Sequence, residues 1–401
     1  MALLSKSTWI IMFGILPVIA VVDVLFGFSR CRIRTYVSQR GLILILGIMV
    51  LNVGYRFDGS FRRLDSFEFH SHTLKGTVGD NRFRDHLVGS IRVPLPQHFV
   101  LGIDEQKTDF ESRFPSYLLG QWKQGGWWYY YIVGAVTKSP CGLVALFAMN
   151  CLLCIGSKTC RPPIDELRAL IFGIAVFILV SSQTGFSHHL RYALPAFPYA
   201  FVFCSRVFRT AHAASLWLRL IAGGLVGLSA IESVVAFPNS PGFFNCVAGG
   251  TGNGHKIMLD SNVDWGQDLF MLRDWQRAHP EADPMKVLTY GILDVQPLGV
   301  TSAGYPPSSA VPTSAQKPID LCAVGPLPGW YAISVTALHW HEHPDKGLLI
   351  KAGVPMCDYF NQFEPVARLG SSILVYCLKD EDVVRVRTSL GLPICTADDQ
   401  K

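Results

Sequence analysis

Long apolar runs in the first 237 residues limit what this chain can fold into. A helix that spans a membrane needs about 20 mostly apolar residues. The chain is only 16% charged, against about 25% in soluble domains. In one run Lys138-Ser139-Pro140 interrupts the apolar pattern, and in another Pro195 and Pro198 predict a kink. The sequence therefore predicts a polytopic α-helical membrane protein with about six spans, at residues 8–28, 41–55 (short for a full span), 127–156, 169–184, 192–208 and 219–237.

The last 160 or so residues have the composition of an ordinary soluble domain. Their apolar residues occur in short runs separated by turn-forming residues. We expect residues 1–240 to form a transmembrane domain with an outward loop at 56–126, and residues 241–401 to form an extracytoplasmic α/β domain. Its expected elements are strands at 255–260, 286–293, 329–338 and 371–378, a helix at 264–280 and a loop at 299–318.

The positive charges in the short loops predict the orientation of the chain. Short loops that are rich in Lys and Arg stay on the cytoplasmic side. Loops 29–40, 157–168 and 206–219 carry such residues, and they alternate along the chain. The turn "SSQTGFSHHLR" and everything after residue 238 should then face outward. The same rule places the start of the chain outside, which suggests that an odd number of upstream spans is missing.

The sequence contains no strong signature for a metal or a nucleotide. Cys151 and Cys154 form a CxxC inside an apolar run, where they are expected to be buried small residues. There is no HExxH, paired CxxC, GxGxxG or P-loop, so we expect no cofactor, and the spacing does not support a divalent cation. The net charge of +5 comes without a basic cluster interleaved with aromatic residues, which argues against a nucleic-acid partner. The C-terminal domain contains five cysteines, at positions 246, 322, 357, 377 and 395. This odd number argues against complete pairing, although one or two disulfides remain possible.

Four basic residues are candidates for binding a lipid phosphate. Arg191 lies in the outward turn "HHLRYALPAFP" and could bind a phosphate through two hydrogen bonds. His188 and His189 could donate hydrogen bonds or carry protons. Lys138 could neutralise the same phosphate. The alternatives are an arginine that reaches to lipid headgroups and an interfacial lysine at a helix break.

The stretch "LDSNVDWGQDLFML" concentrates polar residues just after the last apolar run. Asp260, Asn262 and Asp264 alternate as in the start of a calcium-binding loop. An EF-hand also needs Gly at its sixth position and Glu at its twelfth, and these positions hold Trp265 and Met271. An EF-hand is therefore excluded.

Two other roles for this stretch stay open. Asp264 could cap the following helix together with Gln267, as in a capping box. Alternatively, the amide and carboxylate groups of Asp260, Asn262, Asp264 and Gln267 could bind a sugar or an acceptor while Trp265 stacks on a sugar ring.

The motif "GIDEQKTDFE" adds four acidic residues within the outward loop. A carboxylate beside an acceptor hydroxyl can remove its proton. The alternative is a solvated surface that has no chemical role. The four residues are Asp104, Glu105, Asp109 and Glu111.

Several stretches, in order, resemble one family. They include "LVGSIRVPLPQHFVLGIDEQKTDFE", "SYLLGQWKQGGWWYYYIVGAVTKSP", "SHHLRYALPAFPYAFV", "LDSNVDWGQDLFMLRDW" and "GPLPGWYAISVTALHW". The chain is similar over residues 86–376 to bacterial GT-C membrane glycosyltransferases related to the dolichyl-phosphate-mannose–protein mannosyltransferases (family 39).

The resemblance implies an enzyme of a bacterial-type plasma membrane. Such an enzyme transfers a sugar from a polyprenyl-phosphate carrier to an extracytoplasmic acceptor, so the implied partners are the lipid-linked donor and membrane lipids. The family's acidic loop after the first span is missing here, because that position holds the Arg-rich loop 29–40. The chain is thus expected to lack the N-terminal catalytic part, and its catalytic residues are not assigned. The alternative is an inactive, membrane-anchored binding or scaffold protein derived from this family.

Overall fold

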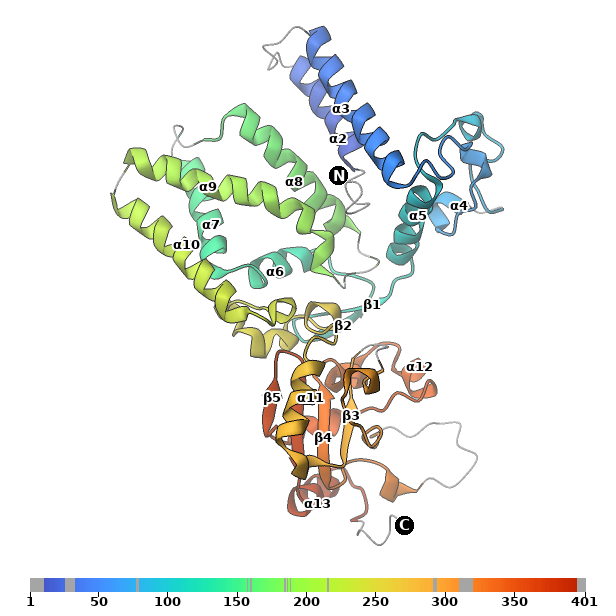
Figure 1. The fold of residues 1–401 in the computed structure, drawn as a ribbon, viewed down its shortest axis with the longest axis vertical. Coiled ribbons are helices and arrows are strands. Elements are labelled where there is room, and N and C mark those ends of the chain that lie inside the picture. The colour runs from blue at the N-terminus through green and yellow to red at the C-terminus, as the bar shows by residue number, and fades with distance from the viewer. Residues whose placement is uncertain are drawn as a thin grey trace. The chain divides into compact units, whose positions relative to one another are not determined.

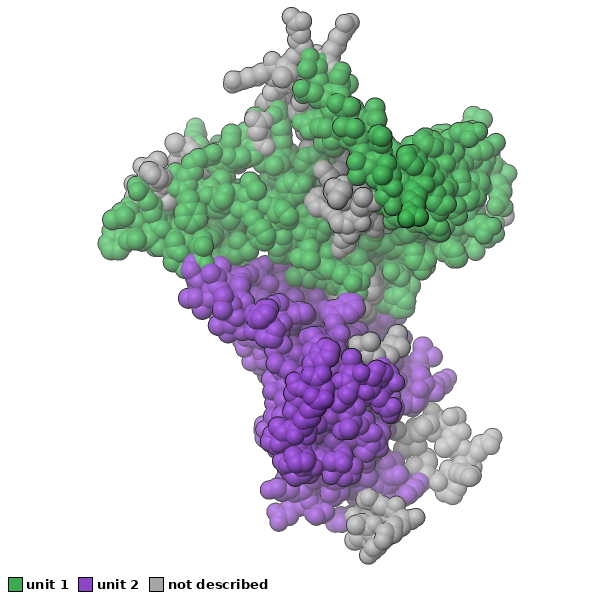
Figure 2. All heavy atoms as spheres, viewed as in Figure 1, with its two compact units in different colours: residues 1–114, 125–133, 142–226 green, residues 115–124, 134–141, 227–401 purple. Residues whose placement is uncertain are grey.

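The computed structural model divides the chain into two compact units, which Figure 2 shows in different colours. Unit 1 comprises residues 1–114, 125–133 and 142–226, and unit 2 comprises residues 115–124, 134–141 and 227–401. The residues that the structure describes are 11–25, 33–76, 79–156, 158, 161–183, 185, 187, 189–214, 216–290, 294–309 and 320–394.

Helices make up most of unit 1 (Figure 1). Within the described residues, α3 (over Val37–Gly54) and α10 are long and apolar enough to cross a membrane. The bent pair α6–α7 adds a third crossing if it forms one span. These helices support membrane association, and the number of six spans stays a prediction. The helices are α2 (Ile11–Leu25), α3 (Ile33–Gly54), α4 (His72–Lys75), α5 (Gln97–Glu111), α6 (Tyr130–Thr137), α7 (Cys141–Gly156), α8 (Ile164–Ser182), α9 (Phe197–Ala214) and α10 (Leu216–Ala236), of which α6 and α10 end in unit 2.

The structure places the helix breaks close to where the sequence predicts them. The predicted break at Lys138-Ser139-Pro140 separates α6 from α7, and the chain bends by 114° between the two helices. Near Pro195 the chain forms two short 3-10 turns, and α9 begins only at Phe197, so the predicted kink is replaced by a helix start. The second predicted span is longer than expected, because α3 starts at Ile33, inside the Arg-bearing loop.

An ion-pair cluster joins the first turn of α8 to the C-terminal half of α9. Glu166, in the first turn of α8, accepts a hydrogen bond from the largely buried Arg206 and pairs with Arg209 at 2.9 Å. Figure 1 shows the two helices side by side. Glu166, Arg206 and Arg209 therefore lie away from the end of this pair where α8 stops at Ser182 and α9 starts at Phe197, and the described residues of the predicted loop 206–219 are helical.

Unit 2 contains a mixed four-stranded sheet with the strand order β3-β4-β6-β5. β3 runs parallel to β4, whereas the β4–β6 and β5–β6 pairs are antiparallel. A separate antiparallel hairpin is formed by β1 (Pro115–Leu118) and β2 (Gln121–Gln124). The remaining elements of the unit are α11 (Leu269–Ala278), β3 (Met285–Leu288), β4 (Gly329–Ser334), α12 (Lys346–Lys351), β5 (Ala367–Leu369), β6 (Ile373–Leu378) and α13 (Asp380–Ser389).

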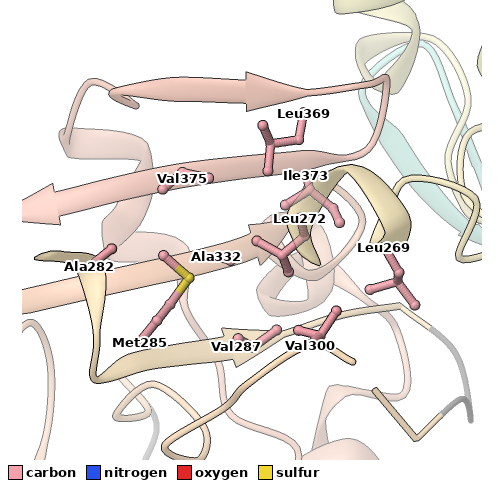
Figure 3. Packing of buried hydrophobic residues seen from close by; sticks show 10 residues of the cluster. All are labelled: Leu269, Leu272, Ala282, Met285, Val287, Val300, Ala332, Leu369, Ile373 and Val375. Carbon is pink, nitrogen blue, oxygen red and sulfur yellow. The ribbon is translucent and has the colours of Figure 1, made fainter. Parts of the chain in front are cut away.

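The core of unit 2 lies between α11 and the sheet (Figure 3). Leu269 and Leu272 lie three residues apart, so they share one face of α11 and point toward the strands. Burying each leucine contributes about 1.5–3 kcal/mol. Pro280 follows the helix, and its ring cannot continue the α-helical hydrogen-bonding pattern.

The predicted strand at 255–260 is wrong. Residues Thr251–Lys256 form a 3-10 helix, and the backbone nitrogen of Ile257 donates to the carbonyl oxygen of Gly254. The predicted helix at 264–280 is shorter, at Leu269–Ala278. Parts of the predicted strands 286–293, 329–338 and 371–378 form β3, β4 and β6.

Candidate functional site

In unit 1, the acidic motif "GIDEQKTDFE" forms most of helix α5, and two of its four carboxylates have structural partners. Asp104 is buried and accepts hydrogen bonds from the backbone nitrogens of His70 (2.5 Å) and Ser71 (3.1 Å). Glu111 accepts from the backbone nitrogens of His72 (2.6 Å) and Thr73 (3.2 Å). These hydrogen bonds hold the segment before and within α4 in place. The alternative of a solvated surface without a role therefore does not apply to Asp104 and Glu111.

The other two carboxylates of the motif, Glu105 and Asp109, interact electrostatically. Glu105 is exposed, and Asp109 is half-buried one helical turn later. Burial, and then the negative charge of Glu105, raise the pKa of Asp109 above its ordinary value. A carboxyl group with a raised pKa is a typical general base or acid. Asp109 is therefore the candidate for proton transfer in this unit.

The turn that carries the candidate phosphate-binding residues packs on the end of α5. The ring of Phe110 lies 5.5 Å from that of Tyr192, measured between centroids. Lys107 donates a hydrogen bond to the side chain of Gln183 at 3.3 Å. At Gly185 the approach is so close that an added Cβ would lie 1.5 Å from the carbonyl oxygen of Phe110.

Two of the three predicted residues in this turn are described. Arg191 is exposed, and its guanidinium carbon lies 5.7 Å from the ring centre of Tyr192. His189 is half-buried, with its ring 5.6 Å from the same tyrosine ring. His188 lies outside the described residues. Tyr192 thus connects both predicted residues to the acidic helix.

Lys138 lies in unit 2 and contacts groups distant in sequence. Its ammonium nitrogen donates to the carbonyl oxygens of Pro241 (3.0 Å) and Asn262 (2.6 Å). It also lies 4.3 Å from the ring centre of Phe244. These contacts give Lys138 a structural role at the helix break, and its role toward a phosphate stays a prediction.

The polar stretch 259–272 supplies most of its hydrogen-bonding groups to unit 2 itself. Asp264 is buried and accepts from the backbone nitrogen of Gly266 (2.8 Å) and the hydroxyl of Ser334 (2.9 Å). Its burial raises its pKa, although these hydrogen bonds act in the opposite direction. Asp260 accepts a hydrogen bond from the hydroxyl of Tyr290. Both carboxylates therefore stabilise the loop that precedes α11.

The predicted capping box does not form. Helix α11 begins at Leu269, and the N-cap position is held by Asp268, whose side chain makes no capping hydrogen bond. Gln267 instead accepts from the backbone nitrogen of Trp265 (2.7 Å) and donates to the carbonyl oxygen of Val263 (2.8 Å). The indole of Trp265, 53% exposed, remains the part of this stretch that could stack on a sugar.

The sequence-based predictions missed Asp268, which accepts more hydrogen bonds than any other carboxylate among the described residues of unit 2. It is fully buried, and its Oδ2 accepts from the backbone nitrogens of Ser371 and Ser372, at 2.8 Å each. The hydroxyls of the same serines donate to it at 3.1 and 2.8 Å. The adjacent Gly370 has φ +58°, and a Cβ there would lie 2.1 Å from the carboxylate. The Gly-Ser-Ser sequence was the available signal, but its partner lies about a hundred positions earlier.

Unit 2 also has a pocket beside the carboxyl end of β3. Its volume is about 600 Å³, and its lining includes Tyr305, Trp340, Asp294 and Gln296. Aromatic rings with a few amide and carboxylate groups are suited to a polar ring such as a sugar.

One group in the described part of the chain has the ligand atoms for a metal. It consists of Cys141, Glu232 and Cys246, whose ligand atoms all lie within 4.8 Å of one another. Comparisons with protein-family models, with curated proteins and with solved structures find no match to this chain.

Proposed function

We propose that this chain is a membrane glycosyltransferase that takes a sugar from a polyprenyl-phosphate carrier. The observation that carries the proposal is the packing of α5 against the turn at 183–192, through Phe110 and Tyr192. Asp109, whose pKa is raised, directly precedes Phe110 in the chain, and the exposed Arg191 directly precedes Tyr192. The apolar helices α3 and α10 support the membrane association that this function needs, and the ordered resemblance to GT-C enzymes suggests the reaction.

The proposed reaction is a direct displacement at the anomeric carbon of the donor sugar. Asp109 takes the proton of the acceptor hydroxyl, and the acceptor oxygen forms a bond to the anomeric carbon. The bond from that carbon to the phosphate oxygen breaks, and the polyprenyl phosphate leaves with the electron pair. Arg191 holds the phosphate through charge-assisted hydrogen bonds, which strengthen as negative charge develops on the leaving oxygen.

The proposal places the chemistry on the outer face of the membrane. The ion pairs of Glu166 with Arg206 and Arg209 support this arrangement, because they keep these basic residues away from the end of α8–α9 where the turn lies. A cytoplasmic location of the basic loops then leaves the turn outside. Within unit 2, the pocket beside β3 is a separate candidate for binding a sugar, with Trp340 and Tyr305 as stacking groups.

Replacing Arg191 by Ala tests the proposal directly. We expect the rate of sugar transfer from a polyprenyl-phosphate donor to fall about 10- to 100-fold, because a hydrogen-bonded charged contact contributes about 1.5–3 kcal/mol. Arg191→Lys should recover only part of the rate, since an ammonium group cannot bind phosphate bidentately. The measurement is transfer of radiolabelled sugar by membranes that carry the chain.

The matched control is Arg277→Ala, which removes another exposed arginine, in unit 2. Its transfer rate should equal that of the unchanged chain. If Arg191→Ala also transfers at the unchanged rate, Arg191 does not hold the leaving phosphate. If the unchanged chain binds the donor but transfers nothing, the alternative of an inactive binding protein is supported. The internal hydrogen bonds of Asp264 and Gln267 leave few polar groups of this loop for a ligand, so neither function is assigned to this loop.

A further inference from the structure

Two cysteines that are distant in the sequence meet in unit 2. Cys141 is the first residue of α7, and Cys246 begins a 3-10 helix at Cys246–Ala248. Their sulfur atoms lie 2.8 Å apart, across 105 positions of sequence. This is closer than two sulfur atoms approach without a covalent or hydrogen bond between them.

The two segments are held in place independently of the cysteines. The side-chain nitrogen of Asn245 donates to the carbonyl oxygens of Val136 (2.6 Å) and Ser139 (2.8 Å). The backbone nitrogen of Asn245 donates to the carbonyl oxygen of Thr137 at 2.9 Å. Asn245 is buried, so these hydrogen bonds are shielded from water. The thiols are therefore brought together by the fold itself.

The third member of the cluster, Glu232, has hydrogen-bond partners in the protein itself. Its carboxylate accepts from the backbone nitrogens of Cys141 (2.6 Å) and Cys246 (3.4 Å). Two thiolates on one zinc ion, at about 2.3 Å from the metal, would lie roughly 3.8 Å apart, whereas bonded sulfurs are about 2.05 Å apart. The observed 2.8 Å is nearer to the bonded value. The engaged carboxylate and the short contact both favour a disulfide over a metal site.

A second observation in unit 2 supports this choice. Cys322 of the same unit is disulfide-bonded. Disulfides persist mainly in oxidising compartments, and a unit with one disulfide is suited to a second. Cys246 is exposed, so an oxidant can reach it.

We propose that Cys141 and Cys246 form a disulfide bond in the mature protein. Both S–H bonds break and one S–S bond forms. The two protons and two electrons pass to a disulfide oxidant, either the disulfide of a thiol oxidoreductase or oxidised glutathione, which is reduced to its thiols. The bond would close a covalent loop that joins the helix break at 138–140 to the segment after α10. This inference is independent of the proposed glycosyl transfer.

The test uses the full chain, purified in detergent without a reductant. Free thiols are blocked with N-ethylmaleimide, the chain is digested, and peptides are compared by mass spectrometry before and after reduction. We expect a linked pair of peptides that contain Cys141 and Cys246 and that separate on reduction. Cys246→Ser and Cys141→Ser should each abolish this pair. Cys151→Ser, which alters another cysteine of α7, should leave it unchanged.

Two results would overturn the proposal. One is complete alkylation of both thiols even after the folded chain is incubated with oxidised glutathione. The other is protection of both thiols by one equivalent of zinc, lost on addition of a chelator, which would assign a Cys-Glu-Cys metal site instead. Both readouts come from the unchanged chain, so they do not depend on the folding of a variant.

Discussion

Replacing Asp268 by Ala is expected to lower the free energy of unfolding of unit 2 by about 3–5 kcal/mol. The Oδ2 atom of Asp268 accepts four hydrogen bonds from Ser371 and Ser372, and the side chain is fully buried. Alanine would leave two buried backbone N–H groups without a partner. Hydrogen exchange of β4 and β6 in the whole chain measures this loss, because these strands open with the core of the unit.

Two further variants separate the hydrogen bonds from the change in volume. Asp268→Asn should cost only about 1–2 kcal/mol. Among the described residues Oδ1 has no partner, so the amide oxygen can take the place of Oδ2 and the amide nitrogen that of Oδ1. Asp274→Ala, with a 61% exposed side chain on α11, should change stability by no more than about 0.5 kcal/mol. Equal exchange rates in Asp268→Ala and Asp274→Ala would show that the buried carboxylate does not stabilise the sheet.

Replacing Asp109 by Asn is expected to slow sugar transfer by about 100- to 10,000-fold, the usual contribution of a general base. The amide has nearly the same shape but cannot take the acceptor proton. Donor binding should be unchanged, because Arg191 lies on a different element and remains in place. The measurement is the initial rate of transfer from the polyprenyl-phosphate donor, together with the affinity for that donor.

The pH profile distinguishes a base from a residue that only supports the fold. Asp109 acts as a base when it is deprotonated, so transfer should rise with pH through its raised pKa. The negative charge of Glu105 contributes to this raised value. Glu105→Gln removes that charge and lowers the pKa of Asp109, so the acidic limb should move to lower pH. An acidic limb that stays in place, or an Asp109→Asn variant with full activity, would exclude this role.

Local sequence patterns predicted the features that depend on neighbouring residues. The Lys138-Ser139-Pro140 break and the short strands β3, β4 and β6 follow from proline, from apolar runs and from turn-forming residues. The first residues of α9 and α11 were less predictable. Pro195 and Asp264 are compatible with several local conformations, and contacts from distant segments select among them.

The candidate sites could be predicted only in part, because their partners lie far apart in the sequence. The acidic motif and the turn with Arg191 were both recognisable, but nothing local indicates that Phe110 meets Tyr192. Likewise, Asp268 and Ser371 are separated by 103 positions. Strand β5, with three residues, is too short to show an alternating pattern.

The central claim is that the turn at 183–196 and the C-terminal residues face away from the cytosol, while the basic loops 157–168 and 206–219 face it. Reporters fused after Lys401 test this claim most directly. Alkaline phosphatase folds only outside the cytosol, and green fluorescent protein exported in an unfolded state does not fluoresce there. We expect an active phosphatase fusion and a dark fluorescent-protein fusion. A fluorescent fusion paired with an inactive phosphatase would contradict the orientation and the outer-face chemistry that depends on it.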